Sequence, residues 1–270
     1  MKLPLLFILT SPSLYAGMSF TEDFMGNPDD PNDLGAFQSL SNSTVASVNN
    51  GTLEFDSPSG QGAAVGTSDL GAALGTSLSD IFFDNNAFTD DSLFLEFTTA
   101  TPGDSGAAEE LGFFLGNPSA SPASGNITQG GTRNGFTVFF NDGDLIVNNN
   151  NNNSNTQVTL FNDLGIGSEV TISVELSLAQ VGQNANDIGF LYTLTAVTEQ
   201  GEFTGDFNGA AQNINANFVD NFEFVASTTE DIAGSLSSFT ISDKPIVPEP
   251  STALLTLLAL PVLLRRRRHA

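Results

Sequence analysis

Between residues 17 and 243, several short segments alternate apolar and polar positions with a period of two. In residues 170–176, four aliphatic residues alternate with threonine, serine and glutamate. This spacing predicts a strand with one face against the core and the other toward water. In residues 189–197 leucine also occupies an intervening position, which predicts a strand covered on both faces. The same alternation predicts strands at residues 52–56, 92–98, 135–141, 218–226 and 238–242.

Short clusters of glycine, asparagine, aspartate and proline separate these strands. Asp142 and Gly143 predict a hairpin turn between residues 136–141 and 144–147, and residues 48–55 contain a second hairpin around Asn50 and Gly51. The six asparagines at 148–153 predict a flexible connection to a strand at residues 156–161. Helical spacing occurs only within residues 68–82, where Gly71 and Gly75 limit it to a short crossover helix.

The number and length of these elements predict one domain. About 230 residues without a second linker favour a single all-β, two-sheet antiparallel β-sandwich over residues 17–243, because all-β domains of this size commonly stay undivided. The chain has 23 phenylalanines, two tyrosines and no tryptophan. Phenylalanine has no polar atom to satisfy, so it is expected to fill the core.

The order of features resembles the concanavalin A-like lectin/glucanase sandwich, a jelly roll. The features are an opening segment at 20–24, an Asn/Asp/Pro loop, the hairpin at 48–55 and a late strand at 237–242. The resemblance implies a fold and does not by itself imply a function.

Charge is distributed unevenly along the chain. Seven Lys and Arg face 31 Asp and Glu, a net charge of −24. Residues 17–247 hold 30 of the acids and only two bases, Arg133 and Lys244, so their net charge is 2 − 30 = −28. Such a body repels phosphate backbones, which excludes nucleic acid as a partner. The chain has no cysteine, and its one histidine is His269, which excludes thiolate sites, Ser-His-Asp triads and the usual zinc sites from the sandwich.

Residues 1–16 have the order of a signal peptide. Lys2 supplies a positive charge, residues 3–9 are apolar, and Ala16 is a small residue at the cleavage position. The alternative is a buried first strand, which Pro4 and Pro12 disfavour.

The C-terminal residues predict a membrane-inserting segment. A linker at 244–250 contains Val247, Pro248, Glu249 and Pro250, and it leads into an apolar run at 251–264. This run predicts a hydrophobic transmembrane helix, although its 14 residues are fewer than the roughly 20 that usually span a bilayer. The tail at 265–270 then keeps its end cytoplasmic and the sandwich outside, because it contains Arg265, Arg266, Arg267 and Arg268.

In its order of Pro-Glu-Pro, hydrophobic helix and arginine cluster, the tail resembles the PEP-CTERM sorting signal of Gram-negative bacteria. The resemblance implies export, transient anchoring in the inner membrane, and release to the cell surface or extracellular matrix by an exosortase-type processing enzyme. By the same resemblance Glu249 is the residue that the enzyme reads. An ordinary tail anchor preceded by a rigid proline spacer is the alternative.

Enzymatic chemistry in the sandwich would need a pair of carboxylates, as in glycoside hydrolysis. Glucanases of the resembling fold place their acids at alternate positions of one strand. Here Glu96 is alone in its strand, Glu169 and Glu175 lie six residues apart on a polar face, and Glu109 and Glu110 fall in a loop. The sequence therefore predicts a non-enzymatic protein with structural or carbohydrate-associated roles, and a glycoside hydrolase is the less favoured alternative.

Two loops carry the oxygen ligands that calcium prefers. Asp29, Asp30 and Asp33 lie in one, and Asp142 and Asp144 flank Gly143 in the other. Neither follows the EF-hand order, which favours solvated turns and no cofactor. Calcium at these residues and a calcium-dependent, lectin-like glycan site remain the alternatives. Tyr192 is expected to be buried, so binding of extracellular polysaccharide would depend on phenylalanine with asparagine and aspartate.

Overall fold

The computed structural model describes the greater part of the predicted sandwich. Described are residues 18–25, 34, 37–39, 45–57, 63–67, 70–76, 78–84, 87–88, 91–102, 111–116, 135–151, 154–180, 188–210, 221–226 and 232–246. The predicted signal peptide, the Pro-Glu-Pro motif, the apolar segment and the arginine tail lie outside these residues, as do Asp29, Asp30 and Asp33. No helix within the described ranges has the length and apolarity to cross a bilayer.

The described residues form strands almost throughout. Two short helices, α1 (Leu70–Leu74) and α2 (Leu78–Phe82), lie between the fifth and sixth strands. The strands are β1 (Ser19–Glu22), β2 (Gln38–Ser39), β3 (Val45–Asn49), β4 (Thr52–Ser57), β5 (Ala63–Thr67), β6 (Phe83–Asp84), β7 (Ala87–Phe88), β8 (Leu93–Ala100), β9 (Leu111–Gly116), β10 (Gly135–Asn141), β11 (Asp144–Asn151), β12 (Ser154–Phe161), β13 (Glu169–Gln180), β14 (Ile188–Thr198), β15 (Gly201–Ala210), β16 (Asn221–Ala226) and β17 (Ile232–Ser242).

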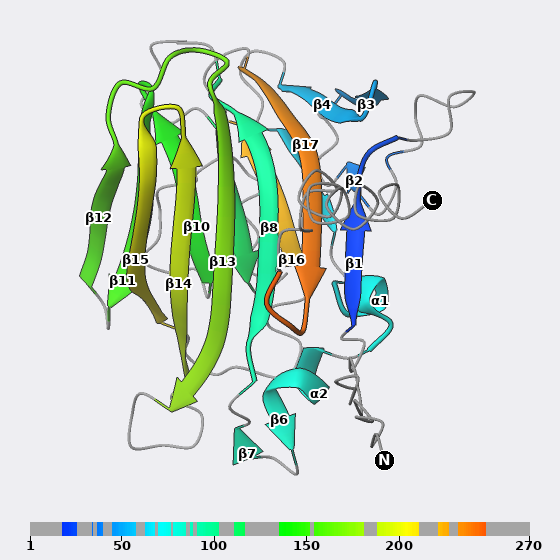
Figure 1. Ribbon diagram of the computed structural model, residues 1–270, viewed down its shortest axis with the longest axis vertical. Helices are drawn as coiled ribbons and strands as arrows, with labels where there is room; N and C mark the ends of the chain where they lie inside the picture. The colour runs from blue at the N-terminus through cyan, green and yellow to red at the C-terminus, as the bar shows by residue number, and fades with distance from the viewer. Residues whose placement is uncertain are drawn as a thin grey trace, which may run out of the picture.

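The strands are arranged in two antiparallel layers (Figure 1). One layer runs β3-β4-β17-β8-β13-β14-β15, with β1 paired to the last residues of β17 on the side where β4 pairs with its first half. The other runs β2-β5-β16-β9-β10-β11, with β12 added beside β11. The layers are joined where β11 meets β15 at the single parallel pair of Asn150 and Gly209.

Apolar side chains from the two layers meet in a common core. On β8, Leu93, Leu95 and Phe97 are buried while the residues between them are partly exposed. Phe97 meets Phe113 of β9 edge to face, with ring centroids 4.5 Å apart. Since β8 and β9 belong to different layers, this contact ties the layers together. The all-β, two-sheet antiparallel sandwich predicted from the sequence is confirmed.

The predicted turns and the helical segment are also confirmed. Asn50 and Gly51 join β3 to β4 with φ of 51° and 82°, and Asp142 and Gly143 join β10 to β11 with φ of 53° and 79°. Positive φ at both central residues defines a type I′ turn. The helical segment divides into α1 and α2 at Gly75, whose φ is 72°.

Three expectations differ from the structure. Asn148 to Asn151 are not a flexible connection: they continue β11 and pair with β12. The last strand begins at Ile232, well before residue 238, because β4 pairs with its first half, from Ile232 to Leu236, before β8 pairs with the remainder. The outer face of β14 is not covered, since Leu191 is 38% and Val197 44% exposed.

Candidate ligand-binding hollow

The outer face of β8, β13 and β14 carries the polar positions of the alternating pattern. Strand register brings them together, because Glu96 lies opposite Ser173 and Phe94 opposite Glu175 in the β8–β13 pair. In the β13–β14 pair, Thr195 lies opposite Ser173 and Thr193 opposite Glu175. Side chains at paired positions point to the same face. Six residues from three strands therefore lie in one patch.

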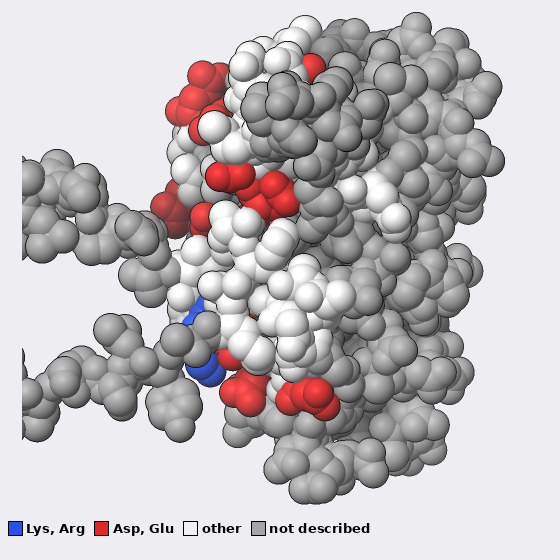
Figure 2. Space-filling view, turned by 90° about the vertical axis from the view of Figure 1, so that its right-hand side faces the viewer, with Lys and Arg blue, Asp and Glu red and all other residues white. Residues whose placement is uncertain are grey.

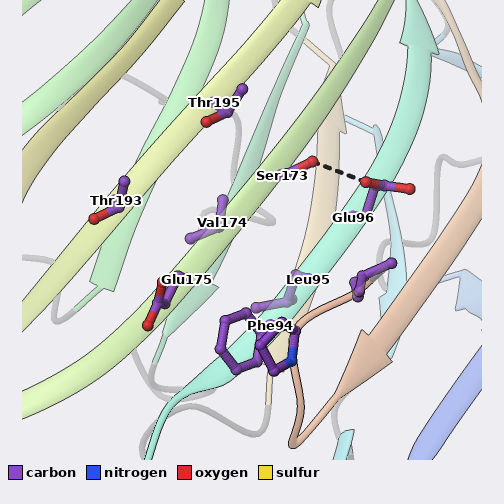
Figure 3. A pocket seen from close by; sticks show the side chains of 10 residues that line it. Phe94, Leu95, Glu96, Ser173, Val174, Glu175, Thr193 and Thr195 are labelled. Atoms are coloured by element: carbon purple, nitrogen blue, oxygen red, sulfur yellow. Dashed lines mark hydrogen bonds between the residues drawn. The ribbon is translucent and has the colours of Figure 1, made fainter. Parts of the chain in front are cut away.

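This patch borders a hollow of about 180 Å³, called the outer-face hollow below. Figure 3 shows its side chains on the three adjacent strands. The chain that leaves β17 passes over one side of it. The lining residues are Phe94, Leu95, Glu96, Ser173, Val174, Glu175, Thr193, Thr195, Pro245 and Ile246.

Hydrogen bonds between neighbouring strands hold the polar side chains of the hollow. The Ser173 hydroxyl donates to Oε2 of Glu96 over 2.9 Å (Figure 3). The Ser92 hydroxyl donates to Oε1 of Glu175 over 3.0 Å, and the Thr193 hydroxyl donates to Oδ1 of Asp206 over 2.7 Å. Both glutamates keep a second oxygen, and every serine or threonine hydroxyl keeps acceptor lone pairs. The hollow thus presents fixed hydrogen-bond acceptors beside the apolar surface of Phe94, Pro245 and Ile246.

Sequence reasoning missed this site. The alternating pattern places Glu96 and Glu175 in two separate strands, whereas the spacing expected of a catalytic carboxylate pair lies along one strand. The pair instead crosses from β8 to β13, with the two glutamates at diagonal positions of the register. Diagonal positions of adjacent strands lie about 7–8 Å apart. The only signal was the shared polar face, because the sequence does not specify which strands are neighbours.

A second hollow, of about 220 Å³, lies where β1, α2 and the end of β17 approach one another. One carboxylate oxygen of Asp243, Oδ1, is buried there without a hydrogen-bond partner. Lys244, the one basic residue within the described ranges, also borders this hollow. In Figure 2, acidic side chains lie close to the blue surface of this lysine. The lining residues are Met18, Thr76, Asp80, Ile81, Asp91, Asp243 and Lys244.

The candidate calcium ligands Asp142 and Asp144 serve the hairpin turn. Asp142 is exposed at the first central position of the turn. Oδ1 of Asp144 accepts the backbone N–H of Asp163 at 2.9 Å, which fixes the turn against the next loop. In the described part of the chain, no three Asp, Glu, His or Cys side chains are grouped so as to hold a metal ion. Asp142 and Asp144 therefore do not form a calcium site together with other described residues. Their positions and the hydrogen bond of Asp144 match a role in the hairpin turn.

Tyr192 lies on the inner side of β14, away from the outer-face hollow. It is 2% exposed, and its ring stacks on Phe207 with centroids 5.6 Å apart. Burial raises the pKa of the Tyr192 phenol above its ordinary value. The prediction that Tyr192 is a buried strand residue is confirmed, so the tyrosine is not a platform for a surface ligand.

The fold is that of legume lectins. Lectin I-B4 from Griffonia simplicifolia, in its metal-free form, matches with a TM-score of 0.52 and 17% identity, over 84% of this chain and 99% of the lectin. The seed lectin of Lotus tetragonolobus matches with a TM-score of 0.50 and 12% identity, over 84% of this chain and all of the lectin (100%). These likenesses confirm the concanavalin A-like sandwich and show the fold alone. No protein-family model matches the chain. No curated protein matches its sequence.

Proposed function

We propose that the chain is an exported, non-enzymatic surface or matrix protein of bacteria, whose sandwich binds a neutral polysaccharide at the outer-face hollow. The observation that carries the proposal is the composition of the hollow. Hydroxyl groups of Ser173, Thr193 and Thr195 and two carboxylates lie beside the ring of Phe94. Sugars have apolar C–H faces and rims of hydroxyl groups, so an aromatic surface flanked by fixed acceptors complements them.

Charge favours a neutral ligand over an anionic one. Two glutamates line the hollow, and Asp206 is hydrogen-bonded to Thr193 at its border. The net charge of −28 for residues 17–247 adds a long-range repulsion for uronic acids, sulfated glycans and phosphate-bearing polymers. Neutral hydroxyl-rich chains meet no such repulsion and can donate to the free carboxylate oxygens.

Binding can be tested with a glycan array and the purified full-length chain, with and without calcium. Glu175→Gln should weaken binding by about tenfold or more, because a hydrogen bond to a charged acceptor contributes about 1.5–3 kcal/mol. Glu169→Gln is the matched control: it lies on the same face of β13 and is exposed outside the hollow. Equal losses in both variants would contradict a site at the hollow. Absence of binding by the wild-type chain under both conditions would favour a purely structural role.

Hydrolysis is the second candidate, and one observation favours it: Glu96 and Glu175 approach the same hollow from adjacent strands. Glycosidases place two carboxyl groups about 5–10 Å apart across the scissile bond. A catalytic acid usually occupies a dry, enclosed position. Here Glu175 is exposed, and each glutamate already accepts a serine hydroxyl. We therefore place binding first. Release of reducing ends from β-glucans, abolished by Glu96→Gln, would instead establish the enzyme.

The export part of the proposal rests on the order of elements at the C-terminus. Replacing Glu249 with Gln should retain the full-length chain in the membrane fraction, if an exosortase-type enzyme reads the Pro-Glu-Pro motif. Glu202→Gln, an exposed change on β15, is the control and should leave release unchanged. Fractionation of the producing cells followed by immunoblotting separates the two results. Equal release of both variants would contradict the sorting proposal.

A further inference from the structure

Strand β12 forms one lateral border of the molecule (Figure 1). Along one side it pairs with β11, from Asn151 opposite Ser154 to Leu145 opposite Phe161. Among the described strands, no other one pairs with β12. Its second row of backbone N–H and C=O groups therefore has no strand partner within the described ranges and can serve as a template for another strand.

The sequence of this border is neutral in a strongly acidic protein. Residues 145–161 contain no Asp, Glu, Lys or Arg, whereas the chain as a whole has 31 acids. Strand β12 itself reads Ser-Asn-Thr-Gln-Val-Thr-Leu-Phe and also lacks proline. Lysine, inward-pointing charges and proline are the usual devices that keep edge strands apart. None of them occurs in β12.

The side chains of β12 alternate between a partly buried and an exposed face, as they do in strands that have neighbours on both sides. Val158 and Leu160 are partly buried and pack against the core. Gln157 and Thr159 are exposed on the other face. The edge is thus pleated, with one apolar and one polar row, and a partner strand could continue both rows.

We propose that β12 pairs antiparallel with β12 of a second copy of this chain. Mutual repulsion opposes the approach of two such polyanions, so a contact between them has to use a neutral surface. A cationic partner would find no electrostatic attraction at β12, because this strand contains no Asp or Glu. The nearest acid along the chain, Asp163, follows the end of β12. Antiparallel pairing keeps the two copies of Asp163 at opposite ends of the contact.

The pleat restricts the register of this contact. Both cores stay on the same side of the joined sheet only when even-numbered residues lie opposite even-numbered residues. Centring the pair on Val158 satisfies this condition and places each Val158 against its copy, a favourable β-branched pair. Gln157 of each chain then lies opposite Thr159 of the other.

Charge substitution at these two exposed positions tests the pairing. The wild-type full-length chain in mild detergent should self-associate, and more strongly as NaCl screens the mutual repulsion. The double variant Gln157→Glu and Thr159→Glu should be monomeric, because each glutamate lies opposite a glutamate of the partner. The matched variant Gln157→Lys and Thr159→Glu should associate again, since lysine then lies opposite glutamate. Sedimentation velocity over a range of protein concentrations gives the association state, and circular dichroism checks that each variant is folded.

Disulfide trapping gives a second measurement in the same full-length chain, which has no cysteine of its own. A mixture of Gln157→Cys and Thr159→Cys chains should form a covalent dimer under mild oxidation, and each variant alone should form far less. Directly opposed positions approach the separation that a disulfide requires.

Three outcomes would overturn the proposal. They are a wild-type chain that stays monomeric at every concentration and salt level, a Glu/Glu variant that associates like the wild type, or a Lys/Glu variant that stays monomeric. None of these readouts depends on glycan binding, so the proposal can fail or succeed independently of the outer-face hollow.

Discussion

Tyr192 is a phenol in a core built mainly of hydrocarbon side chains. Its ring stacks on Phe207, and burial raises the pKa of its hydroxyl above the ordinary value of about 10. Above about pH 10 the unfolded chain therefore loses a proton that the folded chain retains. A group whose folded pKa is raised contributes stability that is complete below the unfolded pKa and is lost as pH rises.

Tyr192→Phe should remove this pH dependence. In the wild-type chain the free energy of unfolding should fall by up to about 1.4 kcal/mol for each pH unit above pH 10. The variant lacks the titrating group, so its decline should be shallower by that amount. Urea denaturation from about pH 8 to about pH 11 measures both slopes. Parallel slopes would show that Tyr192 ionises equally in the folded and unfolded chains.

The β10–β11 hairpin shows how one turn is fixed by its surroundings. Gly143 has φ of 79°, and a Cβ built there would lie 3.1 Å from the carbonyl oxygen of Leu164. The Leu164 N–H donates to the Gly143 carbonyl at 2.9 Å, so the two segments cannot move apart freely. Gly75 has nearly the same φ, 72°, but no atom lies within 4 Å of its Cβ position.

Gly143→Ala should therefore destabilise the protein more than Gly75→Ala. Both changes place a Cβ in the left-handed region, at a cost of about 1–2 kcal/mol. Only Gly143→Ala adds the clash with Leu164. Chemical denaturation of the two variants gives the difference, and equal losses would mean that the loop at Leu164 moves aside without cost.

Local sequence patterns were enough to predict those turns and strands whose conformation depends mainly on their own residues. Asp142 and Gly143 specify a tight turn wherever the flanking strands pair, and residues 170–176 alternate strictly enough to assign both faces of β13. Asn148 to Asn151 have low strand propensity, yet they lie in β11 because β12 supplies a complete ladder partner. The outer-face hollow likewise arises from the register of β8 against β13, strands 69 residues apart at Ala100 and Glu169. Pairing between strands so far apart in sequence depends on the whole fold, so no local sequence pattern predicts it.

On the scale of the whole molecule, charge opposes compactness. Between residues 17 and 247 the bases Arg133 and Lys244 face 30 acids. Among the described residues, Glu96, Glu175 and Asp144 accept hydrogen bonds from neutral hydroxyl or backbone donors. Such bonds orient a carboxylate but leave its charge in place, so repulsion accumulates over the surface.

Salt should therefore stabilise the folded chain. Screening shortens the reach of the repulsion to about 8–10 Å at physiological ionic strength, and each 1 kcal/mol recovered raises the melting temperature of a domain of this size by about 2–4 °C. Calorimetry in increasing NaCl gives this dependence. A melting temperature independent of NaCl would mean that the acids repel one another too weakly to affect folding.

Calcium at equal ionic strength separates screening from binding, because an ion bound only by the folded state adds stability by mass action. Asp142→Asn with Asp144→Asn keeps the oxygen that accepts the Asp163 N–H, so the turn should remain intact. Since these residues join no described metal-binding group, the double variant should retain whatever response to calcium the wild type has. A response lost in that variant would contradict their assignment to the turn alone. A response lost only with Asp29→Asn, Asp30→Asn and Asp33→Asn would instead place a calcium site in the first acidic loop.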